Sequence, residues 1–363
     1  MATTALDDAL ALSVLDALAA DAGVDVSRVT LSAVHTSRRD RTTVHVLDIE
    51  VDGRERRVVL KVVPPEPRRG HAERPRLAPL FDRDEVAALE HRGLVTIQRQ
   101  LTVVDDPRFG YVRPIALLGD HRAVLMHHVD APTFRASLVR RHRLRGEGAP
   151  DLVAAADNTG AWLRAYQDTE NQGAPVRHDE RAEIVEVVER FAKWFTGLRD
   201  GEPAAALARS LARAAPHVLP DRLPVALGHG DFAPRNVLVR PDGQVTVIDP
   251  LPRWRVPVYE DAACFLVSLR LVGPRLVAPA YFRRGMVEGL ADRFVESYTA
   301  GAASGRGGVT VYEGIVLLDT WSAILAAGSE DGSWARRARV FVSAPTLRAE
   351  ARRIAERLAR VQS

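Results

Sequence analysis

The chain contains almost no cysteine and almost no lysine. Cys264 is the only cysteine, so no disulfide can form within the chain, which fits a protein of a reducing cytoplasm. Of the 50 basic residues, only Lys61 and Lys193 are lysines. Where this arginine-biased sequence keeps a lysine, we expect the position to need a compact ammonium group rather than a guanidinium.

Long apolar runs and a targeting segment are also missing. No apolar run approaches the ~20 residues that cross a bilayer. The N-terminus contains Asp7 and Asp8 and lacks the basic region of a secretory signal. It predicts a helix instead, with apolar residues at spacings near four: Leu6, Leu10, Val14 and Leu18. We therefore expect a cytoplasmic protein without a membrane span.

The overall charge gives little support for a nucleic-acid partner. The net charge is +3, and 46% of the 363 residues are hydrophobic, which is ordinary for a globular protein with two domains. The pI near 9.3 follows from the arginine bias. No basic stripe is interleaved with aromatic residues, so a nucleic-acid-binding regulator is the weakest of the functional alternatives.

The first third of the sequence predicts a sheet. Five segments rich in β-branched residues are bounded by turn signals, and we expect strands over 28–34, 43–51, 56–63, 111–118 and 122–129. A helix is expected over 82–92, between the third and fourth strands. The order predicts a five-stranded antiparallel sheet with one main helix.

The remainder is mostly helical, with clear apolar faces over 180–195 and 344–361. The exception is 236–249, where two apolar runs flank "PDG" and predict a hairpin. We therefore expect an α+β chain of two lobes. Residues 1–129 would form a β-rich N-lobe, and residues 130–363 a larger helical C-lobe that contains the hairpin.

The octapeptide "HGDFAPRN" (229–236) places polar residues between two apolar stretches. A simple turn, with Asp231 and Asn236 bonding their own backbone, would also explain it. Phosphoryl transfer, however, needs a base for the acceptor hydroxyl, a divalent metal and a cation on the phosphates. Asp231 is the predicted base. Asn236, together with Asp249 at the end of "VTVID", would suit magnesium, which binds few protein oxygens.

These residues resemble the aminoglycoside phosphotransferase-like family of small-molecule kinases, which includes choline kinases and shares the protein-kinase fold. The corresponding protein-kinase motifs are H-R-D-L-x-x-x-N and D-F-G, and here Asp249 follows Asn236 by thirteen residues. The resemblance implies a bilobal protein-kinase-like fold, with ATP or GTP and Mg²⁺ as cofactors. It extends over most of the chain in outline, and residue by residue over four short stretches.

A second stretch of resemblance is "VVLKVV". Lys61 is similar to the strand lysine that holds the α- and β-phosphates and pairs with a helix glutamate. Glu85 and Glu90 both lie in the following helical segment. We favour Glu85, because it precedes Leu89 by one turn as in the E-x-x-x-L pattern of the family, and keep Glu90 as the alternative.

The third stretch, "AVLMHHVDAPTF" (123–134), resembles the last N-lobe strand and the hinge. The resemblance implies that backbone groups of His127, His128 and Val129 bind the nucleotide base, with Met126 behind it. A metal site at the two histidines is disfavoured, because neighbours on a strand point to opposite faces.

Two features depart from the family pattern. The segment 35–44 contains no glycine, so Ser37, Thr36 or the arginines there would contact the phosphates in place of a Gly-rich loop. The second departure is a proline, Pro250, directly after Asp249.

The fourth stretch is "YEDAACFL". Asp261 corresponds to an aspartate that begins a helix and braces the catalytic loop, although an ordinary helix-starting acid would also fit. His229 is interpreted as a packing and hydrogen-bonding residue of the loop rather than as a base.

The acceptor is expected to be small. Only eleven residues separate Asp249 from Asp261, too few for a peptide-binding activation segment. Residues 271–363 contain 13 arginines and nine acids, which weighs against a polycationic aminoglycoside, and Gln167 occupies a position where the family has histidine. We favour a sugar, aminocyclitol or envelope glycan. An antibiotic-inactivating kinase and a catalytically silent nucleotide-binding module are the alternatives.

Overall fold

The computed structural model describes residues 6–38, 42–64, 73–79, 82–143, 151–168, 173–198, 201–272, 284–301, 303–329 and 334–362. The chain divides into two compact units. Unit 1 comprises Met1–Pro67, Leu80–Ala131 and Thr246–Pro252, and unit 2 comprises Arg68–Pro79, Pro132–Val245 and Arg253–Ser363. Each unit is described by itself.

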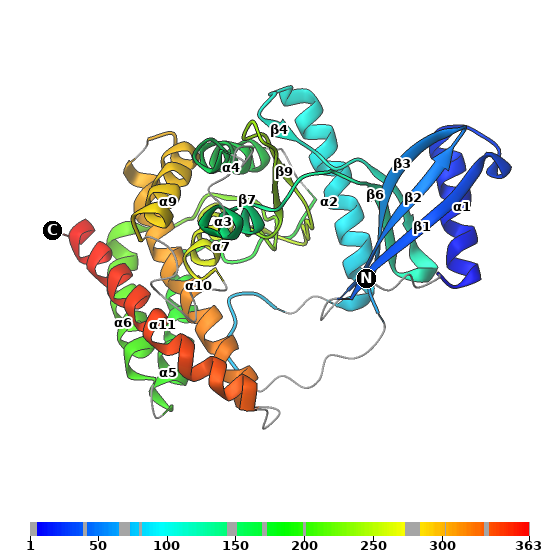
Figure 1. Cartoon of the computed structure of the whole chain (residues 1–363). Helices are drawn as coiled ribbons and strands as arrows, with labels where there is room; N and C mark the ends of the chain where they lie inside the picture. Colours follow the sequence, from blue (N-terminus) through cyan, green and yellow to red (C-terminus); the bar gives the residue numbers. More distant parts are fainter. Residues whose placement is uncertain are drawn as a thin grey trace. The chain divides into compact units, whose positions relative to one another are not determined.

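Unit 1 is built on one antiparallel sheet of five strands in the order β1-β2-β3-β6-β5 (Figure 1). Its elements are α1 Asp8–Ala22, β1 Val29–Arg38, β2 Thr43–Val51, β3 Arg54–Val62, α2 Arg83–Val104, β4 Phe109–Gly110, β5 Pro114–Leu118 and β6 Ala123–His127, with 3-10 turns at Val26–Arg28 and Gly119–His121. This architecture confirms the predicted fold class.

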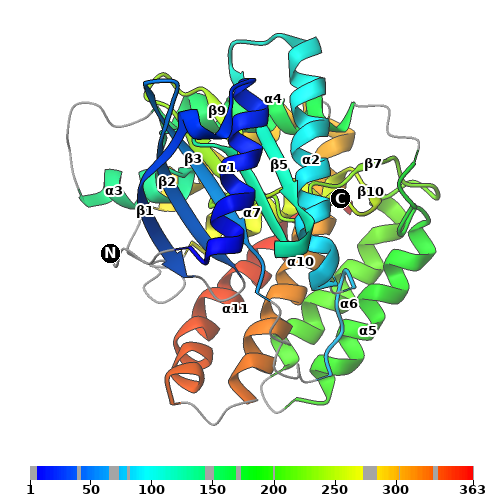
Figure 2. The same ribbon diagram turned by 90° about the vertical axis from the view of Figure 1, so that its right-hand side faces the viewer.

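The helix α1 packs on one face of this sheet (Figure 2). Leu10, Val14 and Leu18 of the helix join alternate strand residues such as Val58 and Leu60 in one buried cluster. Side chains alternate between the two faces of a strand. The residues between these, Val59 and Lys61, therefore lie on the opposite face.

The helix α2 packs on that opposite face. Its Ala87 and Leu94 form a second cluster with Val63, Val124 and Met126 of the sheet. The helix is longer than the predicted 82–92, because Leu94, Ile97 and Leu101 continue its buried face. It ends at Asp105, whose φ of 46° lies in the left-handed region and closes the last turn.

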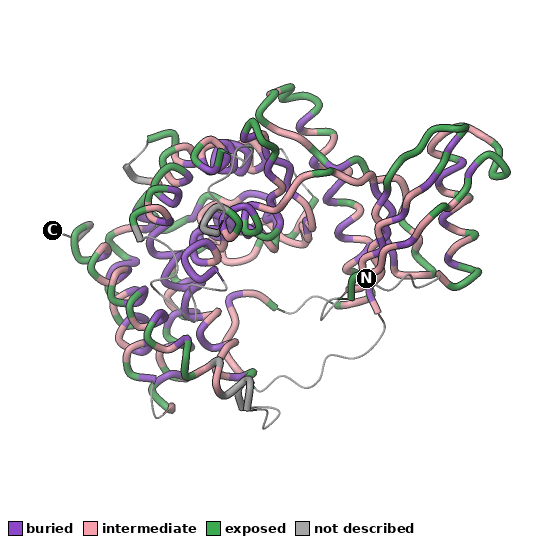
Figure 3. The backbone as a smooth tube through the Cα atoms, in the orientation of Figure 1, coloured by how far each residue is buried: buried purple, intermediate pink, exposed green. Residues whose placement is uncertain are grey.

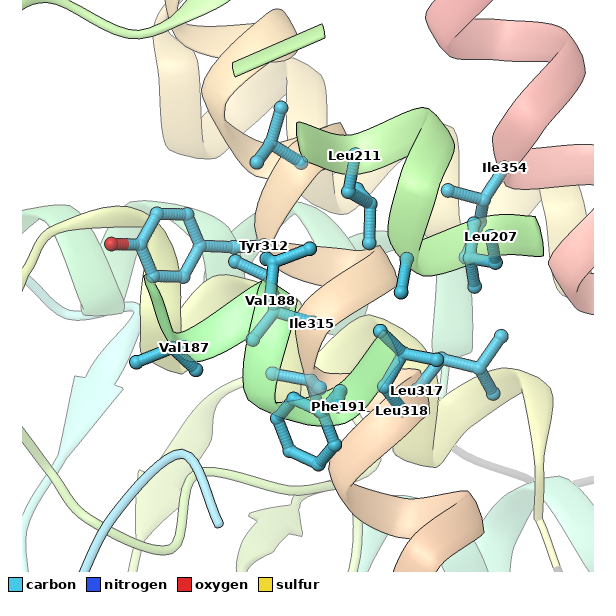
Figure 4. Packing of buried hydrophobic residues seen from close by; sticks show 14 of the residues in the cluster. Val187, Val188, Phe191, Leu207, Leu211, Tyr312, Ile315, Leu317, Leu318 and Ile354 are labelled. Carbon is cyan, nitrogen blue, oxygen red and sulfur yellow. The ribbon is translucent and has the colours of Figure 1, made fainter. Parts of the chain in front are cut away.

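Unit 2 is mainly helical. Its helices are α3 Phe134–Arg143, α4 Leu152–Gln167, α5 Arg181–Thr196, α6 Glu202–Val218, α7 Tyr259–Arg270, α9 Arg284–Thr299, α10 Ala303–Ser329 and α11 Trp334–Gln362. Four short strands accompany them: β7 Val225–Leu227, β8 Val237–Val239, β9 Val245–Val247, whose last two residues belong to unit 1, and β10 Arg255–Pro257. The main core of unit 2 joins α5, α6, α10 and α11, and its buried cluster includes Phe191, Leu211, Ile315 and Ile354 (Figure 4).

The helix α10 is apolar enough to resemble a membrane span. Its segment Gly305–Ala327 has a mean hydropathy of 1.4, but 72% of that window is buried inside the protein. Tyr312, Ile315 and Leu318 are fully buried in the core of unit 2. By contrast, the part of α11 over residues 341–360 alternates between buried and exposed positions (Figure 3). The burial of α10 is that of a core helix.

The structure differs from the predicted domain division at two segments. The prediction divided the chain once, at residues 129 and 130, and assigned Asp249 to the second lobe. Thr246–Pro252 instead packs with unit 1, and Arg68–Pro79 packs with unit 2. Strand β6 also ends at His127, so His128 and Val129 follow the strand rather than belong to it.

Candidate active site

A buried lysine and two carboxylates meet on the α2 face of the sheet in unit 1. The Lys61 Nζ lies 2.8 Å from Glu90 Oε2 and 2.9 Å from Asp249 Oδ1. Only 11% of the Lys61 side chain, 1% of Glu90 and 22% of Asp249 are exposed. The three residues come from β3, from α2 and from the segment after β9. We call them the lysine triad.

The prediction that Glu85 pairs with Lys61 is wrong, because the partner is Glu90. Residues five positions apart on a helix are separated by about 140° around its axis. Glu90 lies on the buried face that packs on the sheet, whereas Glu85 lies in the exposed first turn. The E-x-x-x-L pattern of the family therefore selected the wrong one of the two glutamates.

Burial and charge act in opposite directions in the lysine triad. The two carboxylates outweigh the effect of burial on Lys61 and raise the pKa of its ammonium, so that it stays charged. Burial first, and then the negative charge of Asp249, raise the pKa of Glu90 to about 7, although Lys61 opposes that rise. One ammonium is shared by two carboxylates, so ionisation of both leaves one excess negative charge that an additional cation would offset.

The backbone at Asp249 is held in an uncommon conformation. Its φ of 60° lies in the left-handed region, which non-glycine residues adopt rarely and aspartate more readily than most. The following Pro250 restricts this residue further. Such backbone conformations are retained where the surrounding structure holds them in place, and they cluster at functional sites.

Ser37 lies on the same face of the sheet as Lys61. Ser37 on β1 is paired with Val44 on β2, and Val44 is paired with Lys61 on β3. Directly opposed residues in a sheet share a face, so Ser37 is two strand spacings, about 10 Å, from Lys61. Its neighbour Thr36 is engaged elsewhere, since its hydroxyl lies 2.9 Å from His45 Nδ1. Ser37 is exposed and stays the predicted phosphate contact of this strand.

The hinge residues agree only in part with the prediction. Met126 is buried in the cluster on the α2 face. The His127 amide donates to the Arg113 carbonyl at 3.0 Å, and the His128 amide donates to the Arg57 carbonyl at 3.2 Å. These two amides are therefore already used in backbone hydrogen bonds, so a contact of His127 or His128 with a nucleotide base would have to use another backbone group.

The amide of Val129 differs from these two. Among the described residues it has no hydrogen-bond partner, while the Val129 carbonyl accepts from the Ala131 amide at 3.0 Å. The His127 ring is directed to the α1 face, where Nε2 lies 3.5 Å from Asp21. The amide of Val129 is therefore still available for the predicted contact with a nucleotide base.

The octapeptide forms a loop in unit 2 between β7 and β8, and its polar side chains bond one another. The Asn236 amide nitrogen donates to Asp231 Oδ2 at 2.9 Å and to the Asp231 carbonyl at 2.8 Å. Within the part of the chain that the structure describes, the amide oxygen of Asn236 accepts no hydrogen bond, so it could bind a cation. Arg235, to which the sequence analysis assigned no role, forms an ion pair with Asp231. The Asp231 side chain is 37% exposed, as a base for an external hydroxyl must be.

Buried groups hold this loop in place through hydrogen bonds and aromatic packing. Asp261 Oδ2 accepts from the His229 amide at 2.6 Å, and Oδ1 accepts from the Gly230 amide at 3.3 Å, so the predicted bracing contact is present. Burial raises the pKa of Asp261 to about 7 despite these bonds. The His229 ring is fully buried and packs edge-on against Trp162 and other aromatic rings. That environment agrees with a packing role for His229.

Gln167 also has a structural role. Its side-chain nitrogen donates to the Val258 carbonyl at 2.9 Å, and its oxygen accepts from the Tyr298 hydroxyl at 2.8 Å. It therefore fixes the residue that precedes α7, the helix on which Asp261 lies.

Magnesium fits the residues assigned to it. Among the described residues no group of three or more His, Cys, Asp or Glu side chains is arranged as a metal cage. Magnesium does not require one, because it keeps several waters and binds one or two protein oxygens together with phosphate. The carboxylate of Asp249 and the amide oxygen of Asn236 are oxygen donors of the hard type that it prefers.

Comparison with solved structures identifies the fold. A choline/ethanolamine kinase family protein from Mesorhizobium loti matches with a TM-score of 0.56 at 14% identity, over 91% of this chain and 92% of that chain. The chain has the fold of the small-molecule kinases. Spectinomycin phosphotransferase APH(9)-Ia, in complex with ADP and spectinomycin, matches with a TM-score of 0.53 at 13% identity, over 96% and 98% of the two chains.

A third match is the macrolide 2'-phosphotransferase MphH from Brachybacterium faecium, with a TM-score of 0.51 at 16% identity, over 92% of this chain and 97% of that chain. No protein-family model and no curated protein matches the sequence. At these identities the matches establish the fold, which agrees with the predicted resemblance.

Proposed function

We propose that the protein is a small-molecule kinase that transfers the γ-phosphoryl group of ATP or GTP to a hydroxyl group. The observation that supports this most strongly is the lysine triad. A buried ammonium between two carboxylates costs stability and has no structural need, but it is the arrangement that holds the phosphates of a nucleotide. The structural match to an ADP-bound phosphotransferase agrees with this proposal.

Each of the site residues in the two units has a proposed task. In unit 1, Lys61 binds the α- and β-phosphates, Glu90 holds Lys61 in place, and the Val129 amide binds the base. In unit 2, Asp231 orients the acceptor hydroxyl and accepts its proton. Asp249 and Asn236 are the proposed magnesium ligands, and the metal supplies charge neutralisation on the phosphates.

We further propose an acceptor that does not depend on several positive charges, such as a sugar, an aminocyclitol or a glycan. Burial, followed by the charges of Glu260, Asp261, Asp231 and Asp319, raises the pKa of the Cys264 thiol well above its ordinary range, so these acids lie around it. Three of the four are paired with arginine: Asp231 with Arg235, Glu260 with Arg177, and Asp319 with Arg74. The charge of the proposed base, like the charges of Glu260 and Asp319, is thus balanced by an arginine, which disfavours a polycationic aminoglycoside.

The deciding experiment measures ATP and GTP consumption with panels of neutral sugars, aminocyclitols, aminoglycosides and macrolides. Asp231→Asn is expected to keep nucleotide binding and to lower turnover by ~10²–10⁴, the usual contribution of a general base. The control is Asp292→Asn, at an exposed position of α9, which should be silent.

Two results would contradict the proposal. If Asp231→Asn keeps more than half of the wild-type turnover, Asp231 is not the base. If ADP binds but no panel member is phosphorylated, a silent nucleotide-binding module is the better description.

A further inference from the structure

The helix α2 contains a glycine at the point where the segment of Asp249 rests on it. Gly93 is buried and lies three residues after Glu90, so the two residues share one face of the helix. A Cβ atom at Gly93 would lie 2.8 Å from both Cβ and Cγ of Pro250 and 2.9 Å from Cδ of Pro252. Real Cβ atoms do not approach other heavy atoms so closely, so a side chain here would force the segment to move.

The neighbouring atoms have little freedom to give way. Both contacts are with proline rings, which are tied to the backbone and fix φ near −65°. Pro250 is buried and directly follows Asp249, whose own φ is 60°. A shift of the Pro250 ring therefore moves the backbone of Asp249, and with it the carboxylate that lies 2.9 Å from Lys61.

The residue before Asp249 is anchored on the same surface. Ile248 packs against the cluster that contains Ala87 and Leu94 of α2. Asp249 is thus held between two contacts with one helix, through Ile248 on one side and Pro250 on the other. The same helix provides Glu90, so α2 supports both carboxylates of the lysine triad.

We propose that Gly93 is a positioning residue for the metal and nucleotide site, and that the absence of a side chain there places Asp249 beside Lys61. The inference rests on the proposed function, since it assigns Asp249 to magnesium. It also gives a role to Pro250, the proline that departs from the family pattern. The rigid ring of Pro250 packs against Gly93 and so fixes the position of Asp249.

The test uses the full chain, with ADP as the probe, and compares its affinity with magnesium and with EDTA. Gly93→Ala is expected to lower the magnesium-dependent gain in affinity about tenfold, because overpacking displaces Asp249, while affinity in EDTA is unchanged. A purely structural role would not change this ratio. The control is Gly119→Ala, since a Cβ at Gly119 of unit 1 meets nothing within 4 Å.

A second variant keeps the inference testable if Gly93→Ala does not fold. Pro250→Ala removes ring atoms from the Gly93 contact and adds none, and should lower the same ratio about fourfold, the equivalent of one lost methylene contact. A wild-type ratio in folded Gly93→Ala, or in folded Pro250→Ala where the first variant does not fold, would overturn the inference.

Failure of the proposed function gives a different result. Wild-type protein that binds no ADP in either buffer would overturn the proposed function and the inference together. If instead Asp249→Ala abolishes the magnesium gain and Gly93→Ala retains it, only the positioning role of Gly93 is wrong.

Discussion

At Glu90, the charge that pairs with Lys61 also lowers the stability of the folded protein. Its carboxylate is 1% exposed and shares the Lys61 ammonium with Asp249. A glutamine at this position would keep the shape and remove the charge. Since burial raises the pKa of Glu90 to about 7, the ionised form is costly in the folded protein.

The first prediction concerns the pH dependence of stability in Glu90→Gln. The folded protein retains the Glu90 proton up to about pH 7, whereas the unfolded chain releases it near 4.5. The stabilisation that this proton provides is therefore complete below about pH 4.5 and is lost as the pH rises through about 7. Relative to wild type, Glu90→Gln should gain up to about 1.4 kcal/mol per pH unit in this range.

Denaturant unfolding at several pH values between 5 and 8 measures this difference. Glu85→Gln, at an exposed position of the same helix, is the control and should follow wild type at each pH. A stability difference for Glu90→Gln that does not change with pH would contradict the assignment.

The second prediction tests whether Lys61 needs an ammonium. Lys61 is 11% exposed between carboxylates at 2.8 and 2.9 Å, and the wider, planar guanidinium of arginine does not fit such a point-charge site. Lys61→Arg is expected to weaken Mg–ADP binding about tenfold or more, although the charge is kept. Lys193→Arg, at an exposed position of α5, should have no effect, and equal ADP titrations for the two variants would show Lys61 to be an ordinary strand lysine.

At the scale of elements, unit 2 depends on close approaches between helices. Gly160 lies on α4, where a Cβ would meet the Phe294 carbonyl and lie 2.9 Å from the Tyr298 amide nitrogen of α9. Trp162 and Tyr166 follow on the same helix and stack beside His229 of the proposed catalytic loop. The spacing between α4 and α9 therefore affects the support of that loop.

The third prediction compares two glycine substitutions in this helix pair. Gly160→Ala should destabilise unit 2 by about 2 kcal/mol or more, because the backbone of α9 cannot yield without moving the whole helix. Gly289→Ala on α9, where a Cβ meets nothing within 4 Å, should stabilise by about 0.5–1 kcal/mol through helix propensity. Thermal unfolding measures both, and the same sign for the two variants would contradict the packing described here.

At the scale of the whole molecule, the residues of the lysine triad and the residues of the proposed catalytic loop belong to different units. Lys61, Glu90 and Asp249 are all in unit 1, whereas Asp231 and Asn236 are in unit 2. The proposed phosphate-binding lysine and the proposed base thus belong to separate cores. Mutations in the lysine triad should affect nucleotide binding, and mutations in the loop should affect turnover.

The fourth prediction is that ADP stabilises the protein more strongly when magnesium is present. A ligand that binds the folded state at about 100 times its Kd adds about 2.7 kcal/mol to the free energy of unfolding. We expect this gain for wild type with ADP and magnesium, and a smaller gain with EDTA or in Asp249→Ala. Thermal scans with each component alone are the controls. A magnesium-dependent gain in Asp249→Ala that equals the gain of wild type would exclude Asp249 as a metal ligand.

Much of the fold was predictable, because the signals are local. The five strands follow from β-branched alternation between turns, and the strand over 43–51 matches β2, Thr43–Val51. The bracing contact of Asp261 also followed from a contiguous motif. The hinge was less predictable, because the use of the His127 and His128 amides depends on distant residues, Arg113 and Arg57.

The sequence by itself determined the fold class and which residue types are available for phosphoryl transfer, because strand periodicity, helix periodicity and the spacing within "HGDFAPRN" are encoded by neighbours along the chain. The tertiary structure alone decided which glutamate meets Lys61, since Glu85 and Glu90 lie on one helix and only the packing of α2 on the sheet selects the buried face. It also decided where Asp249 lies. Its position depends on the contact of Pro250 with Gly93, and a contact between residues far apart in sequence leaves no local pattern to read.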